Sequence, residues 1–474
     1  MPKTLPSDGP VPTLDRRRFL QTSAATLTLA CGDKGTLDDT GGSPGDPPES
    51  TKRFPRTPIA GDMTDTRVVF TFFVADDSPV RFRAWDGDDL VIDMPVAPSG
   101  DGFHKLVIED LTPATTYRYV ILGGRSAPFE NRSLYGQVRT ALAPGALEPV
   151  RIALMCCIGQ GTILPDYYFP PETIRPTTEP FQWEVLTHAG DRDLDALIHL
   201  GDQAYLDFVW LDEGGTQEAY LAAWGWYHGG GYRDVYPLAG LYATWDDHEA
   251  ADNAIFDPWA LEPDEDERLA NAHAAWYRVM PIAAASPAEG PVWRDFRWGD
   301  TLELLLLDCR YELTPDRLVS PAQLDWLVER IAASPCRFVC IATPKPFAEI
   351  TSSSELLSDN ADRWEGYPAD RARITDRLDA LDRAGVIFVC GDIHTNYLGQ
   401  VKLDGETPSE RCWEVCCSSG NVNPLTLGFS PEQFPFLDTS PHLPVLTFDP
   451  TAGTVHVAFY GVDGSLTFEQ TLDV

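Results

Sequence analysis

Residues 196–205 read Ala-Leu-Ile-His-Leu-Gly-Asp-Gln-Ala-Tyr and set the expectation for the fold. The first half is an apolar run of strand length. The second half begins with Gly201 and Asp202, which are typical of a tight loop. In α/β folds, ligands bind in loops at the carboxyl ends of buried strands. This segment therefore predicts a buried strand whose loop carries chemistry.

Other apolar runs after Pro149 repeat this pattern, with amphipathic helices between them. The expected strands are Arg151–Cys156, Leu241–Trp245, Leu302–Asp308, Phe338–Ala342 and Val386–Cys390. The clearest expected helices are Pro321–Ala333 and Ala369–Ala384, the second followed by Gly385 as a stop signal. Apolar strands that alternate with helices predict an α/β or α/β/α sandwich over residues 150–474.

The region before Pro149 has a different pattern, because short alternating strands are separated by turn residues. The expected strands are Arg67–Val74, Val80–Trp85 and His104–Ile108. Their spacing predicts a β-sandwich over residues 58–143. The segment Leu111–Tyr119 resembles the strand entry of fibronectin type III-like domains, a module that says little about function.

Side chains that bind metals follow four of the expected strands. The four loops contain Cys156-Cys157, Gly201–Tyr205, Asp246–Glu249 with the following Asp252-Asn253, and Gly391–Asn396. Carboxylate, imidazole, amide, thiolate and phenolate groups are all metal ligands, and the rule for α/β folds places them at one edge of a sheet. A single Asp-His pair is more often a capping or core pair, but four such loops favour a metal site.

These motifs resemble the alkaline phosphatase D (PhoD-like) family of calcineurin-like metallophosphoesterases. The resemblance covers about residues 58–474 and rests on Cys157, Gly201–Tyr205, Trp245–Glu249 with Asn253, and Gly391–His394. It implies an α/β protein with an N-terminal fibronectin III-like β-sandwich followed by an α/β/β/α metallophosphoesterase domain. It also implies a phosphatase or phosphodiesterase site that holds Fe3+ and Ca2+.

The resemblance assigns roles to single residues. Cys157, Asp202 and Tyr205 would bind Fe3+, and thiolate and phenolate are strong anionic donors suited to a trivalent ion. His248 would be the catalytic residue that protonates the leaving alcohol or binds a phosphoryl oxygen. The other metal ligands would be Asp246 or Asp247, a choice the sequence leaves open, with Asn253, Asp392 and His394.

Two features depart from the family pattern. Cys156-Cys157 replaces the usual Ser-Cys, and we expect Cys157 to be the ligand because alternation places Cys156 in the strand. The segment Thr343–Pro346 has no obvious counterpart in the family. Its Lys345 is a candidate for substrate binding, the ordinary alternative being an exposed loop lysine. His228, in an aromatic and Gly-rich segment, is a second candidate for the substrate pocket.

The motifs together predict a secreted or membrane-anchored enzyme in which a metal-activated hydroxide hydrolyses a phosphate monoester or diester. A second hypothesis is a phospholipid-directed phosphodiesterase on the same scaffold. The relative turnover of monoesters and diesters would distinguish it from the first hypothesis. A third, from a different class, is a surface lipoprotein that binds an envelope partner and has a vestigial site. The intact ligand set argues against the third hypothesis.

Residues 1–31 are expected to be an export signal. Arg16–Leu20 contains a twin-arginine motif, and the apolar segment Thr22–Ala30 is shorter than the roughly 20 residues that span a bilayer. Ala30-Cys31 suits lipoprotein processing, in which Cys31 is lipidated. We expect the twin-arginine machinery as partner, a periplasmic or cell-envelope lipoprotein, and membrane contact only through that lipid. Residues 32–57 are expected to be a disordered linker.

Composition limits the partners further. The chain has 474 residues with 72 Asp+Glu against 36 Lys+Arg, a formal net charge of -36. This charge excludes nucleic acid as a structural partner, because phosphate backbones are bound through Lys and Arg. It leaves phosphate esters as substrates, provided that metal ions supply local positive charge.

Overall fold

The computed structural model describes residues 46–158, 183–252, 260–284, 286–350, 363–420 and 429–474. Pro47–Val474 forms one compact unit. The twin-arginine motif and Cys31 lie outside the described residues, so the export signal and the lipid anchor stay predictions. In the described part of the chain, no helix combines the length and the apolar character needed to cross a membrane.

Nine strands form the first sheet, in the order β20-β19-β18-β8-β9-β10-β1-β2-β5. Their bounds are β1 (Ile59–Gly61), β2 (Val68–Phe73), β5 (Phe103–Ile108), β8 (Val150–Met155), β9 (Ala196–His199), β10 (Gly240–Ala243), β18 (Leu443–Asp449), β19 (Thr454–Tyr460) and β20 (Leu466–Asp473). Strands β8, β9 and β10 run parallel. Their carboxyl ends therefore lie at one edge of the sheet.

Seven strands form the second sheet, in the order β11-β12-β13-β14-β16-β15-β17. Their bounds are β11 (Arg294–Trp298), β12 (Leu302–Leu306), β13 (Phe338–Ala342), β14 (Val386–Cys390), β15 (Asn396–Gln400), β16 (Cys412–Cys416) and β17 (Phe436–Asp438). A third sheet has the order β4-β3-β6-β7. It consists of β3 (Val80–Asp86), β4 (Asp89–Val96), β6 (Thr116–Gly123) and β7 (Gly136–Arg139).

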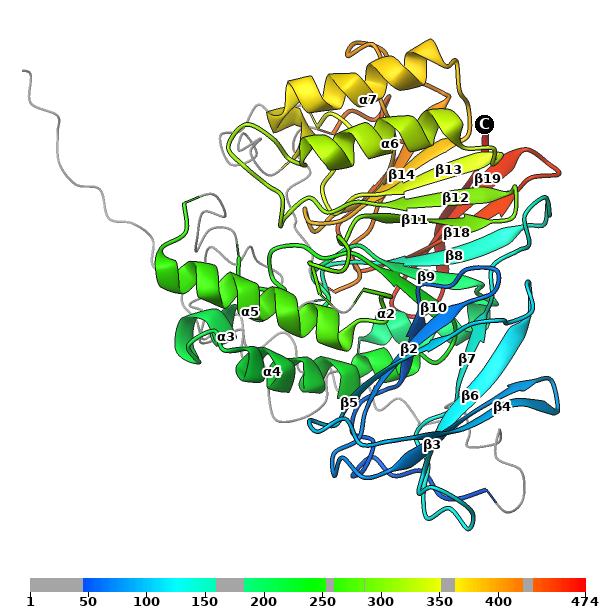
Figure 1. The fold of residues 1–474 in the computed structure, drawn as a ribbon. Coiled ribbons are helices and arrows are strands. Elements are labelled where there is room, and N and C mark those ends of the chain that lie inside the picture. Colours follow the sequence, from blue (N-terminus) through cyan, green and yellow to red (C-terminus); the bar gives the residue numbers. More distant parts are fainter. Residues whose placement is uncertain (1–45, 159–182, 253–259, 285, 351–362, 421–428) are drawn as a thin grey trace, which may run out of the picture. The chain divides into compact units, whose positions relative to one another are not determined.

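Helices cover the outer faces of the two large sheets. Figure 1 shows α6 and α7 over the second sheet and α4 and α5 beside β9 and β10. The helices are α2 (Glu184–Thr187), α3 (Asp207–Asp212), α4 (Gln217–Gly229), α5 (Pro263–Val279), α6 (Pro321–Ala333) and α7 (Pro368–Ala380), with 3-10 turns η4 (Ala189–Arg192), η5 (Gly231–Asp234) and η8 (Trp364–Gly366). One buried cluster contains Ile152 and Ile198 of the first sheet together with Leu304 and Ile387 of the second. The sheets therefore pack face to face, and the predicted α/β/β/α layering is confirmed.

The predicted strands and helices form, with small shifts at their ends. The strand expected over Leu302–Asp308 ends at Leu306, where the polar loop begins. The helix expected over Ala369–Ala384 ends at Ala380. It stops early because Asp382 adopts a positive φ of 47° and donates its N–H back to Asp379. Helix α6 has the predicted bounds, with Ser320 as its N-cap and a proline in the first turn.

The N-terminal β-sandwich is present, and one of its sheets continues into the C-terminal part of the chain. Phe70 of β2 packs against Phe82 and Tyr119 of the third sheet, which closes the sandwich. Strand β1 also pairs in parallel with β10, with Gly61 opposite Leu241. The segments expected as two domains therefore share one sheet.

The expected linker over residues 32–57 is wrong for residues 46–57. Ser50 N–H donates to Arg132 O at 3.0 Å, and Glu49 forms an isolated bridge with Arg132. Phe54 is only 4% exposed. This one large apolar side chain, together with backbone pairing to residue 132, holds the segment in place despite its polar composition.

Candidate metal centre

The loops predicted to hold metal ligands meet at one place. Three groups have ligand atoms within 4.8 Å of one another: Cys157, Asp202 and His394; Asp202, Asp247 and His248; and Asp246, Asp247 and Asp392. These loops follow β8, β9 and β10 of the first sheet and β14 of the second. The two facing sheets thus place their strand ends around a common centre, with Asp202 shared by two of the groups.

Four of the predicted ligands have a left-handed backbone. The φ angles are 52° at Cys157, 53° at Asp202, 70° at Asp392 and 56° at His394. Such conformations are unfavourable for residues with a side chain and persist only where the surrounding structure imposes them. Because they gather at active and binding sites in proteins generally, their coincidence here supports a functional centre.

Tyr205 adds a phenol to the first group. Its hydroxyl lies 3.0 Å from His394 Nε2 and 3.4 Å from Asp202 Oδ2. Cys157 and Tyr205 are both almost fully buried. The sequence-predicted set of thiol, carboxylate, phenol and imidazole is therefore brought together.

The buried carboxyl of Asp202 fits a metal ion. Burial raises the pKa of Asp202 well above its usual value and does the same for the pKa of Cys157. Burial also lowers the pKa of His394 to about 4. Asp202 Oδ1 is buried and has no hydrogen-bond partner among the described residues. A buried polar atom without a partner is costly, and a cation would supply the missing interaction.

His248 is held by Asp207, a residue that the sequence analysis missed. His248 Nδ1 lies 3.0 Å from each carboxylate oxygen of Asp207, and both side chains are buried. The ring also stacks on Tyr205 with centroids 3.9 Å apart. Burial alone would lower the pKa of His248, but the carboxylates of Asp207, Asp247 and Asp202 raise it well above the usual value. Asp207 lies in sequence just beyond the Gly-Asp motif, and this proximity is the only signal that could have found it.

Glu249 joins two of the ligand loops. Its carboxylate accepts the backbone N–H groups of Asp202 at 3.1 Å, Gln203 at 2.6 Å and Asp246 at 2.8 Å. Burial raises the pKa of Glu249 to about 8, although these donors act in the opposite direction. The sequence shows Glu249 only as the last residue of a motif. In the structure it fixes the loop after β9 against the loop after β10.

The geometry separates the two neighbouring aspartates. Asp246 is paired with cations on both oxygens: Arg310 Nη2 lies 2.7 Å from Oδ1, and Lys345 Nζ lies 3.1 Å from Oδ2. Asp247 belongs to two of the three ligand groups, the one that contains Asp202 and the one that contains Asp246. Arg310 Nη2 lies 3.5 Å from Asp247 Oδ1. This arrangement favours Asp247 as the metal ligand and Asp246 as an anchor for the basic side chains.

The other three predicted residues are Lys345, His228 and Asn253. Lys345 is fully buried beside Asp392, so it is not an exposed loop lysine. His228 is 2% exposed and packs among the rings of Trp224, Tyr232 and Tyr236, outside the three ligand groups. Asn253 lies outside the described residues, so its role stays a prediction.

Residues 179–434 match the family described as PhoD-like phosphatase. Over 200 residues the chain is 27% identical to alkaline phosphatase D of Bacillus subtilis (strain 168), covering 35% of this chain and 33% of that protein. The match thus spans about a third of the curated relative's length.

The fold is shared with solved structures, among them the following two. The structure of PhoD superposes with a TM-score of 0.72 at 20% identity and covers 90% of each chain. The purple acid phosphatase PPD1 from yellow lupin (Lupinus luteus) seeds gives a TM-score of 0.62 at 12% identity, covering 88% of this chain and 74% of the other. At these identities the two structures support the fold, and the family match supports the kind of site.

Proposed function

Since the chain belongs to the PhoD-like phosphatase family, we propose that it is a metal-dependent phosphoesterase whose reaction takes place at the centre around Asp202. The observation that carries the proposal is the buried Oδ1 of Asp202, which has no hydrogen-bond partner in the described part of the chain, in a carboxylate shared by two groups of ligand atoms. Both features would be accounted for if Asp202 helped to hold a cation in each of the two groups. A phosphate ester is the corresponding substrate, because its negative oxygens are complementary to a cationic centre.

The donor types support a particular assignment of the metals. Cys157, Asp202, Tyr205 and His394 would hold Fe3+, because thiolate and phenolate suit a trivalent ion. Asp202 and Asp247 would hold Ca2+ with oxygen donors, joined by Asn253 through the family resemblance. When bound, the ions would activate a water molecule and offset the charge of the phosphoryl oxygens.

The protein's own part in the reaction is proton transfer to the leaving group. His248 Nδ1 donates its proton to Asp207, so Nε2 is the nitrogen through which His248 would give a proton to the departing alcohol. Asp207 fixes the tautomer of the ring, and Tyr205 fixes its plane by stacking. His248 therefore approaches the substrate in a defined orientation.

Metal analysis and a visible spectrum of the purified full chain test this proposal. We expect iron in the protein and a tyrosinate-to-iron absorption band that disappears in Tyr205→Phe. Tyr311→Phe, at a residue 45% exposed, is the matched control and should keep the band. Asp202→Asn should lose hydrolysis of p-nitrophenyl phosphate. Colourless, iron-free but active protein would refute the iron assignment, and full activity of Asp202→Asn would refute the metal-dependent mechanism.

We also propose that the chain is exported by the twin-arginine route and anchored in the cell envelope through Cys31. The support is the Arg16–Leu20 motif and the Ala30-Cys31 pair. Replacement of Arg16 and Arg17 by lysine should retain the protein in the cytoplasm. Cys31→Ser should release it from the membrane fraction. Export that is unchanged by the first variant would contradict the route, and unchanged membrane association of the second would contradict the anchor.

A further inference from the structure

We propose that the ammonium group of Lys345 takes the place of a metal cation between Asp246 and Asp392. The centre would then hold ions only in the two ligand groups that share Asp202. This inference rests on the proposed function, because it concerns how the same centre is charged. It also gives a role to the segment Thr343–Pro346, which the family resemblance did not explain.

The position of the ammonium is the first argument. Lys345 Nζ lies 2.6 Å from Asp392 Oδ1 and 3.1 Å from Asp246 Oδ2. Lys345 and Asp246 have side chains that are 0% exposed. A Ca2+ ion contacts its oxygen ligands at about 2.3–2.6 Å. An ion that bridged these two carboxylates would therefore occupy nearly the same space as Nζ, and the two cannot be present together.

The pairing of Asp246 is the second argument. Its other oxygen, Oδ1, accepts a hydrogen bond from Arg310 Nε at 2.9 Å and also lies 2.7 Å from Arg310 Nη2. Arg310 is itself 3% exposed. Both oxygens of Asp246 are thus neutralised by protein cations. Asp246 Oδ2 and Asp202 Oδ1 both lack a hydrogen bond among the described residues, but Asp246 Oδ2 lies 3.1 Å from the Lys345 ammonium. The described residues place no lysine or arginine at ion-pair distance from Asp202 Oδ1. The ligand groups around Asp202 are therefore the ones that need metal ions, whereas Asp246 already has positive charge from Lys345 and Arg310.

The loop that carries Lys345 is the third argument, since it holds the ammonium in place. Pro344 O accepts the Gly391 N–H at 3.0 Å, which ties this loop to the loop of Asp392. The Thr343 hydroxyl donates to Lys345 O at 3.0 Å, and Trp364 Nε1 donates to that hydroxyl at 3.0 Å. A lysine held by its backbone within a buried cluster acts as a fixed point charge with three donors.

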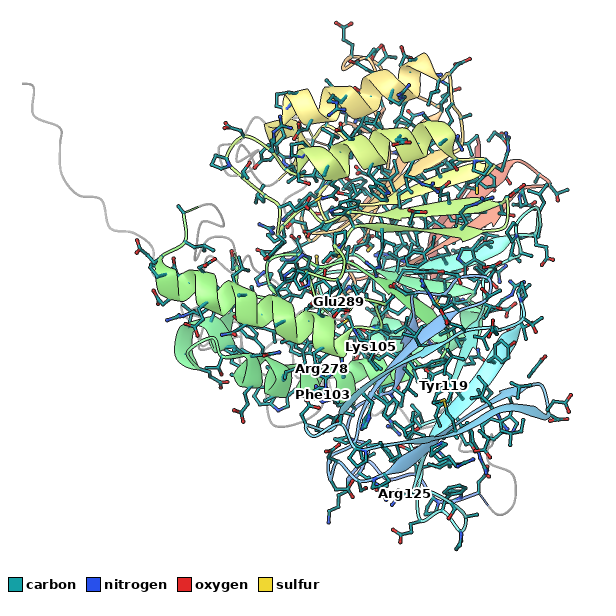
Figure 2. The ribbon with its side chains drawn as sticks, viewed as in Figure 1. Phe103, Lys105, Tyr119, Arg125, Arg278 and Glu289 are labelled. Carbon is teal, nitrogen blue, oxygen red and sulfur yellow. The ribbon has the colours of Figure 1, made fainter. Side chains whose placement is uncertain are left out.

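The test is the number of metal ions per chain in Lys345→Ala. Removal of the ammonium leaves Asp246, Asp247 and Asp392 within 4.8 Å of one another around an emptied position. We expect the variant to bind about one more Ca2+ per chain than the wild type, measured by native mass spectrometry and by calorimetric titration with CaCl2. Lys105→Ala is the matched control. Figure 2 labels Lys105. Its Nζ donates to the backbone carbonyls of Tyr277 and Ala284, and not to the carboxylates of the metal centre. It should bind the same number of ions as the wild type.

The outcomes distinguish this inference from the proposed function. An unchanged or smaller number of ions in Lys345→Ala overturns the inference, even if the wild type contains iron and hydrolyses phosphate esters. A wild type without metal or activity overturns the proposed function instead. If Lys345→Ala fails to fold in calcium-free buffer, recovery of its thermal transition with millimolar CaCl2 supports the inference. Failure to fold with and without calcium counts against it.

Discussion

In the proposed reaction Asp207 acts through His248, and its Oδ1 also accepts the backbone N–H of Asp252. Because Asp207 accepts the Nδ1 proton, Asp207→Asn should misorient the ring and weaken its action as an acid. We expect kcat to fall by roughly 10²–10³-fold, within the usual range for a general acid. The loss should be larger for an alkyl phosphate than for p-nitrophenyl phosphate, because p-nitrophenolate leaves without a proton. Steady-state kinetics on both substrates measure this difference.

The control for this prediction lies on the same helix. Asp212, at the other end of α3, is exposed, and Asp212→Asn should leave both rates unchanged. Equal losses for the two substrates in Asp207→Asn would show that the carboxylate supports the fold instead of the proton transfer.

Glu249 gives a second prediction at the scale of one side chain. An intramolecular hydrogen bond contributes about 0.5–1.5 kcal/mol to stability, and Glu249 accepts three from the backbone of two ligand loops. Glu249→Gln should lower the melting temperature by several degrees and speed the loss of metal to EDTA. Glu303 is equally buried but is paired with Arg330 in another part of the second sheet. Glu303→Gln should lose stability while it retains metal, and equal metal loss in both variants would contradict the role of Glu249.

At the scale of the elements, the centre depends on how closely β8 approaches the end of β14. A Cβ added at Gly391 would overlap Cys156 Sγ and lie 2.6 Å from Cys156 Cβ. Gly391→Ala should therefore push the Asp392 and His394 loop away from Cys157, at a cost of about 1–3 kcal/mol for overpacking. We expect loss of the iron band and a lower melting temperature. Gly190→Ala is the control, because its nearest contact would be Leu238 at an ordinary 3.7 Å. An unchanged iron band in Gly391→Ala would contradict this dependence.

The elements also explain which parts of the site were predictable. Cys157, Asp202, Asp247 and His394 each follow an apolar strand, so local pattern and the strand-end rule were enough to bring them together. Lys345 and Asp246 belong to loops of different sheets, and their ion pair depends on how those sheets pack. No short-range pattern records that packing. The pairing of β1 with β10 was missed for a similar reason, because β1 has only 3 residues and its partner is far away in the sequence.

At the scale of the whole molecule, buried hydrogen bonds join the N-terminal sandwich to the catalytic half. Thr71 Oγ1 donates to Val279 O at 2.9 Å, and Tyr242 hydroxyl donates to Met63 O at 2.7 Å. Arg294 pairs with the buried Asp62 at 2.7 Å. If one half unfolded alone, these bonds would be lost and the apolar surface that the halves share would be exposed to water. The two halves should therefore depend on each other for stability.

A cooperative transition is the resulting prediction. Calorimetry of the full chain should show one unfolding peak, with calorimetric and van't Hoff enthalpies that agree. Gly61→Val should lower the temperature of that whole peak, because a side chain there would collide with Leu241 O of β10 and with Pro281. A valine is otherwise favourable in a strand, so the loss would come from the junction. The matched control is Gly190→Val, since among the described residues a Cβ there would lie closest to Leu238, at an ordinary 3.7 Å. Two separate peaks, with the sandwich melting first and Gly61→Val moving only that peak, would show instead that residues 58–143 unfold as an independent domain.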